Sequence, residues 1–504
     1  MPSKPNILIL MADQLTPTAL PAYGNRTART PHLDALAERA VVFRSAYCNS
    51  PLCAPSRFSF MSGRLPSAIG AYDNAAEFAA QVPTFAHYLR LAGYRTLLSG
   101  KMHFCGADQL HGFEERLTTD IYPADFGWTP DWLNFAHRPG WYHSMDSVTQ
   151  AGPCARTNQI DFDDEVVFRA RRRLFDLARG NDRRPFCMVV SMTHPHDPFA
   201  IPHEYWNRYS DRDIDMPRVH VAVQDLDPHS RRLRHVCGLD TQAVTEAQIR
   251  AARHAYYGAV AYVDDQVGSL VAALEETQVA GQTVIVVLAD HGEMLGERGL
   301  WYKMSFFEPA CRIPLFIHAP RLFSARSVAQ SVSLVDLLPT LLELANDGQA
   351  TPIAGQLDGH SLLPHLQGSG GHDEVLGEYL AEGAIAPIVM IRSGQQKFIH
   401  SPADPDQLFD LATDPDELHN LAAADQAVNT LRARVAQTWS LQQLHAEVLA
   451  SQQRRLLVDA ALRLGRRTSW DYQPIVDASA QYVRNDQSLE TLEASARFPR
   501  FSGT

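Results

Sequence analysis

Two continuous apolar runs, each followed by an acidic residue, constrain the fold of this 504-residue chain more than any other feature. Residues 6–12 and 283–289 are mostly aliphatic and lead directly into Asp13 and Asp290. Runs without polar alternation are typical of strands that are buried on both faces of a parallel sheet. Ligands of open α/β sheets bind beyond the carboxyl ends of the strands. We therefore expect Asp13 and Asp290 to meet at one edge of the sheet.

Helical patterns lie between the strand-like segments, and this alternation predicts an α/β fold with a large, mostly parallel central sheet flanked by helices. Residues 185–192 and 313–317 also have the composition of buried strands. A helix is expected over residues 31–40. A longer helix should follow Thr245, where Thr245 and Gln248 fit a capping box.

The amino-acid composition changes near residue 346, where a stretch rich in Gly, Pro and His begins. We interpret residues 1–345 as a catalytic domain and residues 346–450 as a smaller subdomain with antiparallel strands. Within the latter, residues 388–391 and 397–399 are strand-like. Residues 451–504 are expected to form a helix and an extended tail.

Composition excludes several classes of protein. A hydrophobic content of 45% with 20% charged residues describes a globular chain, and no apolar run approaches the roughly 20 residues of a membrane span. Seven cysteines without a CxxC pair argue against a disulfide framework and against a structural zinc site. Without a signal-peptide pattern, the prediction is a cytoplasmic protein. A net charge of −12 disfavours nucleic acid and sulfated polysaccharides as partners.

The sequence CAPSR at residues 53–57 resembles the C-x-P-S-R signature of the type I sulfatases, which belong to the alkaline phosphatase superfamily; the match extends to Leu52 and residues 62–64. The resemblance implies an alkaline-phosphatase-like fold and conversion of Cys53 to formylglycine by a formylglycine-generating enzyme. The hydrated aldehyde would be the nucleophile of a sulfate ester hydrolase. Arg57 is expected to hold this diol or its metal partner. The alternative for Cys53 is a buried structural cysteine.

The same resemblance implies a site for one divalent cation, which would stabilise negative charge on the sulfate oxygens. Its expected ligands are Asp13, Gln14, Cys53 (as formylglycine), Asp290 and His291. The commonest arylsulfatases have Asp-Asp and Asp-Asn at these strand ends, whereas Asp-Gln and Asp-His resemble the choline sulfatases and the phosphonate monoester hydrolases. Calcium suits the oxygen ligands. Manganese is the alternative, because the imidazole is a softer ligand.

Two further motifs supply candidates for sulfate binding and proton transfer. Lys101 and His103 lie in a sequence that resembles the G-K-x-H element of sulfatases, with Lys101 on the sulfate oxygens and His103 on the diol. His196 lies in a P-H-x-P-F loop and is the predicted general acid or leaving-group contact, with His194 as the second choice. Lys303 matches a lysine that contacts the sulfate. The implied reaction is S–O cleavage in two steps, in which the alcohol leaves first and sulfate second.

Within the sulfatases, the chain resembles the choline sulfatases in particular, and this resemblance extends over nearly the whole chain. It is most specific over residues 109–131 and continues through residues 73–77, 295–301 and 489–493. This resemblance implies choline-O-sulfate as the substrate. Three tryptophans fall close together in this part of the chain: Trp128, Trp132 and Trp141.

A quaternary ammonium is recognised by aromatic faces and nearby carboxylates. Trp128 is the predicted face, whereas core packing is an equally good interpretation of the other two tryptophans. By resemblance, Glu382 supplies a carboxylate, Asn74 contacts a sulfate oxygen, and Glu490 reaches a neighbouring subunit. The chain departs from the family at Ser144, where an asparagine is usual.

Three other functions remain open. The chain could hydrolyse phosphonate or phosphate esters with the same metal set, or it could be a sulfatase for another small aliphatic sulfate. A non-catalytic binder of sulfated ligands would result if Cys53 were never converted. The family tail implies a homodimer or homotetramer with exchange of the C-terminal tail, and no membrane partner.

Overall fold

The computed structural model describes residues 4–122, 124–346, 351–466, 470–475, 482 and 488–499. Within these ranges, nine strands form the central sheet, in the order β11-β2-β10-β8-β1-β6-β3-β4 with β9 paired to β2. Most pairs are parallel, and β10 is antiparallel to both of its neighbours. The strands are β1 (Asn6–Ala12), β2 (Val41–Tyr47), β3 (Arg95–Gly100), β4 (Glu115–Arg116), β6 (Phe186–Met192), β8 (Thr283–Ala289), β9 (Arg312–Ile313), β10 (Leu315–His318) and β11 (Arg326–Ser333).

The predicted strands occupy the middle of this sheet. Strands β1 and β8 coincide with the two apolar runs, and β6 with the third, and all three are almost completely buried. The stretch 313–317 does not form one strand, because Pro314 separates β9 from β10. Proline lacks the amide donor that a continuous ladder needs at this point.

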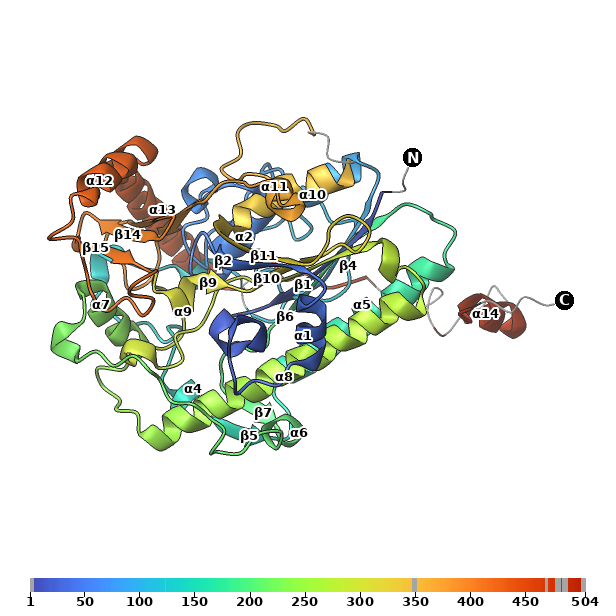
Figure 1. The fold of residues 1–504 in the computed structure, drawn as a ribbon, viewed down its shortest axis with the longest axis horizontal. Helices are drawn as coiled ribbons and strands as arrows, with labels where there is room; N and C mark the ends of the chain where they lie inside the picture. The colour runs from blue at the N-terminus through green and yellow to red at the C-terminus, as the bar shows by residue number, and fades with distance from the viewer. Residues whose placement is uncertain are drawn as a thin grey trace.

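Helices cover both faces of the sheet, with α1, α5 and α8 on one side and α2, α10 and α11 on the other (Figure 1). Helix α1 ends at Ala37, earlier than predicted, whereas α8 begins after the predicted Thr245–Gln248 capping box. The helices are α1 (Pro31–Ala37), α2 (Cys53–Ser62), α3 (Phe85–Leu91), α4 (Asp146–Thr149), α5 (Asn158–Arg179), α6 (His203–Trp206), α7 (Pro228–Cys237), α8 (Glu246–Glu276), α9 (Glu308–Cys311), α10 (Leu337–Ala345), α11 (Leu363–Gln367), α12 (Ala427–Thr438), α13 (Leu441–Leu462) and α14 (Leu489–Ala496).

A second, smaller sheet follows the central sheet in the chain. It is antiparallel and consists of β12 (Glu374–Tyr379), β13 (Ile388–Ser393), β14 (Gln396–Ser401) and β15 (Asp404–Asp410). The predicted fold class, with a mostly parallel central sheet and a smaller α+β part, is therefore confirmed. The exact domain limits at residues 345 and 450 stay predictions.

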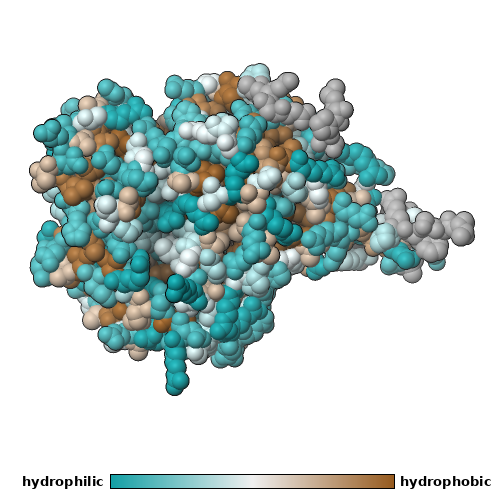
Figure 2. All heavy atoms as spheres, in the orientation of Figure 1, coloured by the Kyte–Doolittle hydropathy of each residue, from teal (hydrophilic) through white to brown (hydrophobic). Residues whose placement is uncertain are grey.

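The surface gives no sign of one dominant apolar region on the face shown in Figure 2, where apolar residues lie in small separate groups among hydrophilic ones. Helix α14 stands apart from the body of the molecule (Figure 1). None of the described helices has both the length and the apolarity that a bilayer crossing requires.

Candidate active site

The carboxyl ends of β1 and β8 lie together, as the apolar runs predicted, and the start of α2 lies against them. Ala12 pairs with Ala289 in the parallel ladder, which places the next residues, Asp13 and Asp290, side by side. The Sγ atom of Cys53 lies 3.2 Å from Nε2 of His291. Residues that are distant in the sequence therefore form one buried cluster.

Cys53 is the first residue of α2 and is almost completely buried. Leu52 before it is extended, and Pro55 fits the first turn, where its missing amide hydrogen is no loss. The Oδ1 atom of Asn74 accepts a hydrogen bond of 2.9 Å from the amide of Ala54, which satisfies one donor at the helix start. The positive end of the helix dipole thus favours an anionic group at position 53.

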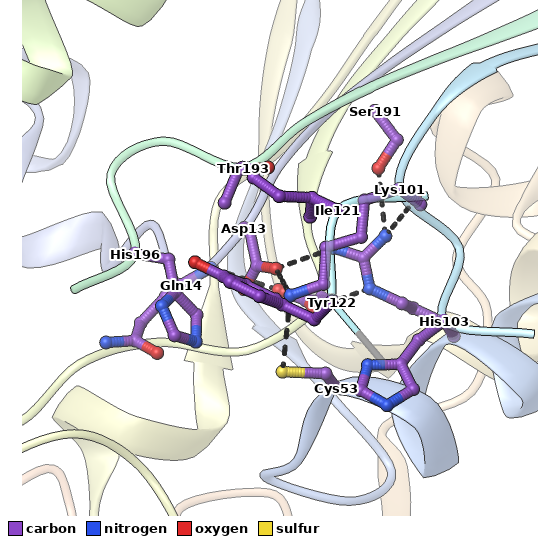
Figure 3. A network of polar contacts seen from close by, with 12 residues as sticks. Asp13, Gln14, Cys53, Lys101, His103, Ile121, Tyr122, Ser191, Thr193 and His196 are labelled. Atoms are coloured by element: carbon purple, nitrogen blue, oxygen red, sulfur yellow. Dashed lines mark hydrogen bonds and ion pairs between the residues drawn. The ribbon is translucent and has the colours of Figure 1, made fainter. Parts of the chain in front are cut away.

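Arg57 holds the two strand-end carboxylates in place. Its Nε atom donates to Asp290 Oδ2 at 2.8 Å, and a terminal nitrogen donates to Asp13 Oδ2 at 3.1 Å. Another contact, of 2.8 Å, joins the guanidinium to the hydroxyl of Ser191 (Figure 3). Burial opposes the charged form, but Asp290 and Asp13 outweigh it and raise the pKa of Arg57 above its usual value. Arg57 therefore acts on the carboxylates, and its contact with a diol or a metal stays a prediction.

The cluster fits a divalent cation. Side-chain ligand atoms of Asp13, Cys53, Asp290 and His291 all lie within 4.8 Å of one another. Oδ1 of Asp13 is buried and has no hydrogen-bond partner in the described part of the chain. Nδ1 of His291 donates to the carbonyl of Gly292 at 3.0 Å, so its Nε2 lone pair faces the cluster. Burial lowers the pKa of His291 to about 4, which keeps the ring neutral and able to bind a metal.

The Gln14 side chain does not join these four groups. Its Oε1 accepts a hydrogen bond of 2.6 Å from Lys303, and its Nε2 donates to Glu293 and, at 3.4 Å, to Asp197. Figure 3 shows the amide on the side away from the Asp13 carboxylate. Ligation of a cation by Gln14 would require its side chain to leave these partners, so its assignment as a ligand stays a prediction.

Figure 3 shows the Lys101 ammonium above the Cys53 sulfur and the His103 ring beside Cys53. Lys101 Nζ pairs with Asp13 and lies 3.9 Å from Cys53 Sγ. Burial alone would lower the pKa of Lys101, but Asp13 and Cys53 raise it. Nε2 of His103 donates to the carbonyl of Asn74 at 3.1 Å, while its buried Nδ1 has no partner among the described residues. Burial and the charge of Lys101 lower the pKa of His103 to about 3, so Nδ1 is a free acceptor.

The structure distinguishes the two candidate histidines of the 194–197 loop. Nε2 of His196 lies 2.7 Å from Lys303 Nζ, and its Nδ1 donates to the carbonyl of Asp197 at 2.6 Å. His194 instead directs its Nδ1 to Asp163 at 2.7 Å, on helix α5. His196 is therefore joined to the cluster through Lys303, whereas His194 is held by a separate carboxylate.

An aromatic wall borders the cluster. The Trp128 ring lies 5.8 Å from that of His103 and stacks on Trp141, with 6.2 Å between centroids and 10° between planes. Trp132 has a different environment, since it is buried and its Nε1 donates to the carbonyl of Ala381 at 2.9 Å. Trp128 and Trp141 therefore form the wall, whereas Trp132 packs near the His445 ring.

Glu382 follows Ala381 and is 4% exposed. Its Oε2 atom is buried and has no hydrogen-bond partner in the described ranges. Burial raises the pKa of Glu382 to about 7, and the neighbouring Asp73 carboxylate adds to this shift. An unpaired buried carboxyl is costly unless a ligand or ion compensates it.

A family model described as Sulfatase matches residues 5–347 of this chain. The chain belongs to the sulfatase family. Two further family models cover its remaining parts, one described as "N-sulphoglucosamine sulphohydrolase, C-terminal" over residues 296–445 and one as "Choline sulfatase enzyme C terminal" over residues 446–498. This sulfatase is therefore an enzyme of the sulfuric ester hydrolase class.

Individual relatives agree with this assignment. The choline-sulfatase of Rhizobium meliloti (strain 1021) is 47% identical to this sulfatase over 99% of both chains. Arylsulfatase K of Danio rerio is 28% identical over 81% of this chain and 78% of its own. Among solved structures, a phosphonate monoester hydrolase of Agrobacterium radiobacter superposes with a TM-score of 0.68 at 25% identity, covering 88% of this chain and 96% of the other.

Several residues of this sulfatase site were not predicted from the sequence. The Tyr122 ring lies 4.8 Å from Lys101 Nζ and 5.8 Å from the His196 ring. His143 stacks on Tyr302 at 4.4 Å and lies 5.9 Å from His196. The available signals were that Tyr122 lies in the 109–131 block and that Tyr302 directly follows the 295–301 block.

The predicted residue Glu490 lies away from the cluster, and Ser144 marks the position where the chain departs from the family. Glu490 is exposed on α14, and α14 is tied to the end of α5 by a hydrogen bond from Arg179 to Ala496. Because α5 leads into the start of β6, this contact lies at the opposite edge of the sheet from the site. Ser144 accepts a hydrogen bond from the Tyr302 hydroxyl through its carbonyl, at 2.6 Å, and its hydroxyl bonds the backbone of Asp146.

Proposed function

We propose that this sulfatase hydrolyses choline-O-sulfate to choline and sulfate. One observation carries the proposal: the Trp128 face borders His103, next to the buried cationic cluster at Cys53. A single site thus combines groups for an anion with an aromatic face for an ammonium ion. The 47% identity to a choline-sulfatase supports the same substrate.

We further propose that Cys53 is converted to formylglycine by a maturation enzyme and that one divalent cation binds beside it. Asp13, Asp290 and His291 would hold the cation, which suits calcium, with manganese as the alternative. The hydrated aldehyde would supply a nucleophilic oxygen, and the cation would lower the pKa of that oxygen and stabilise charge on the sulfate.

The lysines and Asn74 would bind the sulfate group. Lys101 and Lys303 are both buried and place positive charge on two sides of the site. Asn74 commits its Oδ1 to the start of α2, which leaves the Nδ2 hydrogens for a sulfate oxygen. These fixed donors would stabilise the charge that develops on the sulfate oxygens.

The two histidines suit the two proton transfers. Choline leaves as an alkoxide unless it receives a proton, and His196 with Lys303 lies where a proton can be delivered. Nδ1 of His103 is a neutral acceptor near the first turn of α2, so it can take a proton when sulfate is expelled. The hydrogen bond to Asn74 holds the His103 ring in this tautomer.

Glu382 makes the binding of choline-O-sulfate dependent on pH. A raised pKa means that this carboxyl is neutral below about pH 7 and charged above it. Since only about a tenth of it is ionised one unit below its pKa, we expect the KM for choline-O-sulfate to fall about tenfold between pH 6 and pH 8. In Glu382→Gln this dependence should disappear, and for an aryl sulfate without an ammonium group it should be absent. A KM that does not change with pH in the unsubstituted enzyme would contradict the role of Glu382.

Substitution of Trp128 tests the substrate. We expect Trp128→Ala to lower kcat/KM for choline-O-sulfate about 30-fold, the equivalent of a desolvated cation–π contact of about 2 kcal/mol. Turnover of 4-nitrophenyl sulfate should change less than about threefold, because that substrate lacks the cation. Steady-state kinetics on both substrates and on an aryl phosphonate measures this.

Trp206→Ala is a matched control, because Trp206 stacks on His254 far from the aromatic wall. Equal losses on both sulfates would contradict recognition of the ammonium group by Trp128. A sulfatase for another small aliphatic sulfate would keep most of its activity on that substrate in Trp128→Ala. A preference of the unsubstituted enzyme for the phosphonate would retain the fold and the cluster but replace the proposed substrate.

We also infer a cytoplasmic homodimer or homotetramer, with tails that exchange between subunits. The exposure of Glu490 on α14, at the far edge of the sheet, supports this arrangement, since Glu490 could contribute to a choline pocket only in another copy of the chain. The absence of any disulfide among the seven described cysteines is compatible with a reducing compartment.

A further inference from the structure

Helix α13 carries buried polar side chains that contact the loops around Asp73 and Thr129. Gln452, Arg455 and Asp459 are spaced along one side of the helix, and none is more than 8% exposed. Buried polar side chains at these positions need partners outside the helix. The amide oxygen of Gln452 accepts a hydrogen bond of 3.0 Å from the backbone of Trp132.

Arg455 makes the strongest of these contacts. Its two terminal nitrogens donate to the two carboxylate oxygens of Asp73, at 2.5 and 2.7 Å. The Asp73 side chain is 0% exposed and that of Arg455 is 7% exposed. One of the same nitrogens also donates to Thr129 Oγ1 at 3.3 Å, and Ser451 on the preceding turn bonds Nε at 3.2 Å. A forked, buried pair of this kind fixes geometry as well as charge.

The two loops that Arg455 joins are the two ends of the proposed substrate site. Asp73 directly precedes Asn74, which caps α2 beside Cys53 and accepts from His103. Thr129 directly follows Trp128. One guanidinium group on α13 therefore connects the sulfate end with the ammonium end.

We infer that Arg455 is a positioning residue that sets the separation between the sulfate-binding and ammonium-binding ends, and so determines the selectivity for choline-O-sulfate. The inference rests on the proposed function. A substrate that is held at both ends is sensitive to this separation, because a displacement of about 1 Å can cost about 100-fold in rate. A sulfate ester held at one end only does not depend on it.

The selectivity ratio is the decisive measurement. It is kcat/KM for choline-O-sulfate divided by kcat/KM for 4-nitrophenyl sulfate, and it is independent of the active fraction of a preparation. We expect Arg455→Met to lower the ratio at least about tenfold and Arg455→Lys, which keeps the charge without the fork, to lower it less. A purely structural role would reduce both rates together and leave the ratio unchanged, which would overturn the inference.

A matched arginine controls for the loss of a forked ion pair. Arg208, two residues after the end of α6, contacts Asp265 on α8 through two hydrogen bonds, of 3.1 and 2.6 Å, and within the described chain it forms no hydrogen bond or ion pair with Asp73, Thr129 or Trp128. Arg208→Met should leave the selectivity ratio unchanged. An equal fall of the ratio in this variant would show that the effect is not specific to Arg455.

A double-mutant cycle tests whether Arg455 acts through Asp73. If it does, Asp73→Asn should also lower the ratio, and adding Arg455→Met should lower it little further. If the double variant lowered the ratio by the product of the two single effects, the two residues would act independently, which would contradict the proposed coupling.

A binding measurement separates the failure of this inference from that of the proposed function. Choline should quench the tryptophan fluorescence of the full chain, even with Cys53 unconverted, and Arg455→Met should weaken this binding at least about fivefold. If the unsubstituted chain prefers choline-O-sulfate but Arg455→Met alters neither ratio nor quenching, the inference alone fails. If the unsubstituted chain shows no such preference and no quenching, the proposed function fails, and the inference fails with it.

Discussion

Cys53→Ala should abolish sulfate ester hydrolysis, with kcat/KM falling at least about 10⁴-fold, as for other enzymes that lose their nucleophile. Within the described chain, Cys53 is the one cysteine in the cluster with Asp13, Asp290 and His291. Alanine at this position removes the side chain that would become the nucleophile, while its small volume leaves the start of α2 intact. Steady-state kinetics should use protein co-expressed with a formylglycine-generating enzyme, and the mass of the peptide that contains residue 53 should establish conversion.

Cys187 provides a matched control, because it is equally buried but lies within β6, away from the cluster. Cys187→Ala should lower the Tm through the small cavity it leaves, yet retain kcat/KM. Retention of more than about 1% of the activity in Cys53→Ala would show that another group attacks the sulfate, and would favour the alternative that Cys53 is structural.

Asp13→Asn should have the next largest effect, lowering bound metal below one ion per chain and kcat/KM at least about 10³-fold. The substitution is nearly isosteric but removes a charge, so Lys101 would lose the carboxylate it pairs with and Arg57 would keep only that of Asp290. Two buried cations with one carboxylate repel a divalent ion. Elemental analysis after dialysis measures the metal content and identifies the ion as calcium or manganese.

Asp163→Asn is the corresponding control for a buried aspartate. Asp163 accepts hydrogen bonds from the backbone of Thr193 and His194 and lies outside the four-residue cluster. Its variant should lose stability but keep the metal. A full complement of metal in Asp13→Asn would contradict the assignment of Asp13 as a ligand.

Much of the fold and the centre of the site could be predicted from the sequence. Continuous apolar runs are compatible with few structures other than buried parallel strands, so β1 and β8 were found with the correct bounds. Adjacent parallel strands end at the same edge, and this geometry alone brought Asp13 and Asp290 together. The CAPSR motif then placed Cys53 beside them, because the motif carries both the residue and the helix start.

Other features required the tertiary structure. The bounds of β9 and β10 differed from the prediction because a single proline interrupts residues 313–317, which had been predicted as one strand from their apolar composition. Hydropathy could not distinguish His194 from His196, since both are buried, and only their hydrogen bonds to Asp163 and Lys303 separate them.

The sequence by itself determined which strands form the core, where they end and which reactive groups stand at those ends, because burial and strand direction follow from local patterns. Only the tertiary structure decided how the polar side chains pair. Arg455 and Asp73 are distant in the chain, and the amide of Gln14 turns toward Lys303 rather than Asp13. Such pairings depend on distances of a few ångströms between segments remote in sequence, and no periodicity or motif encodes them.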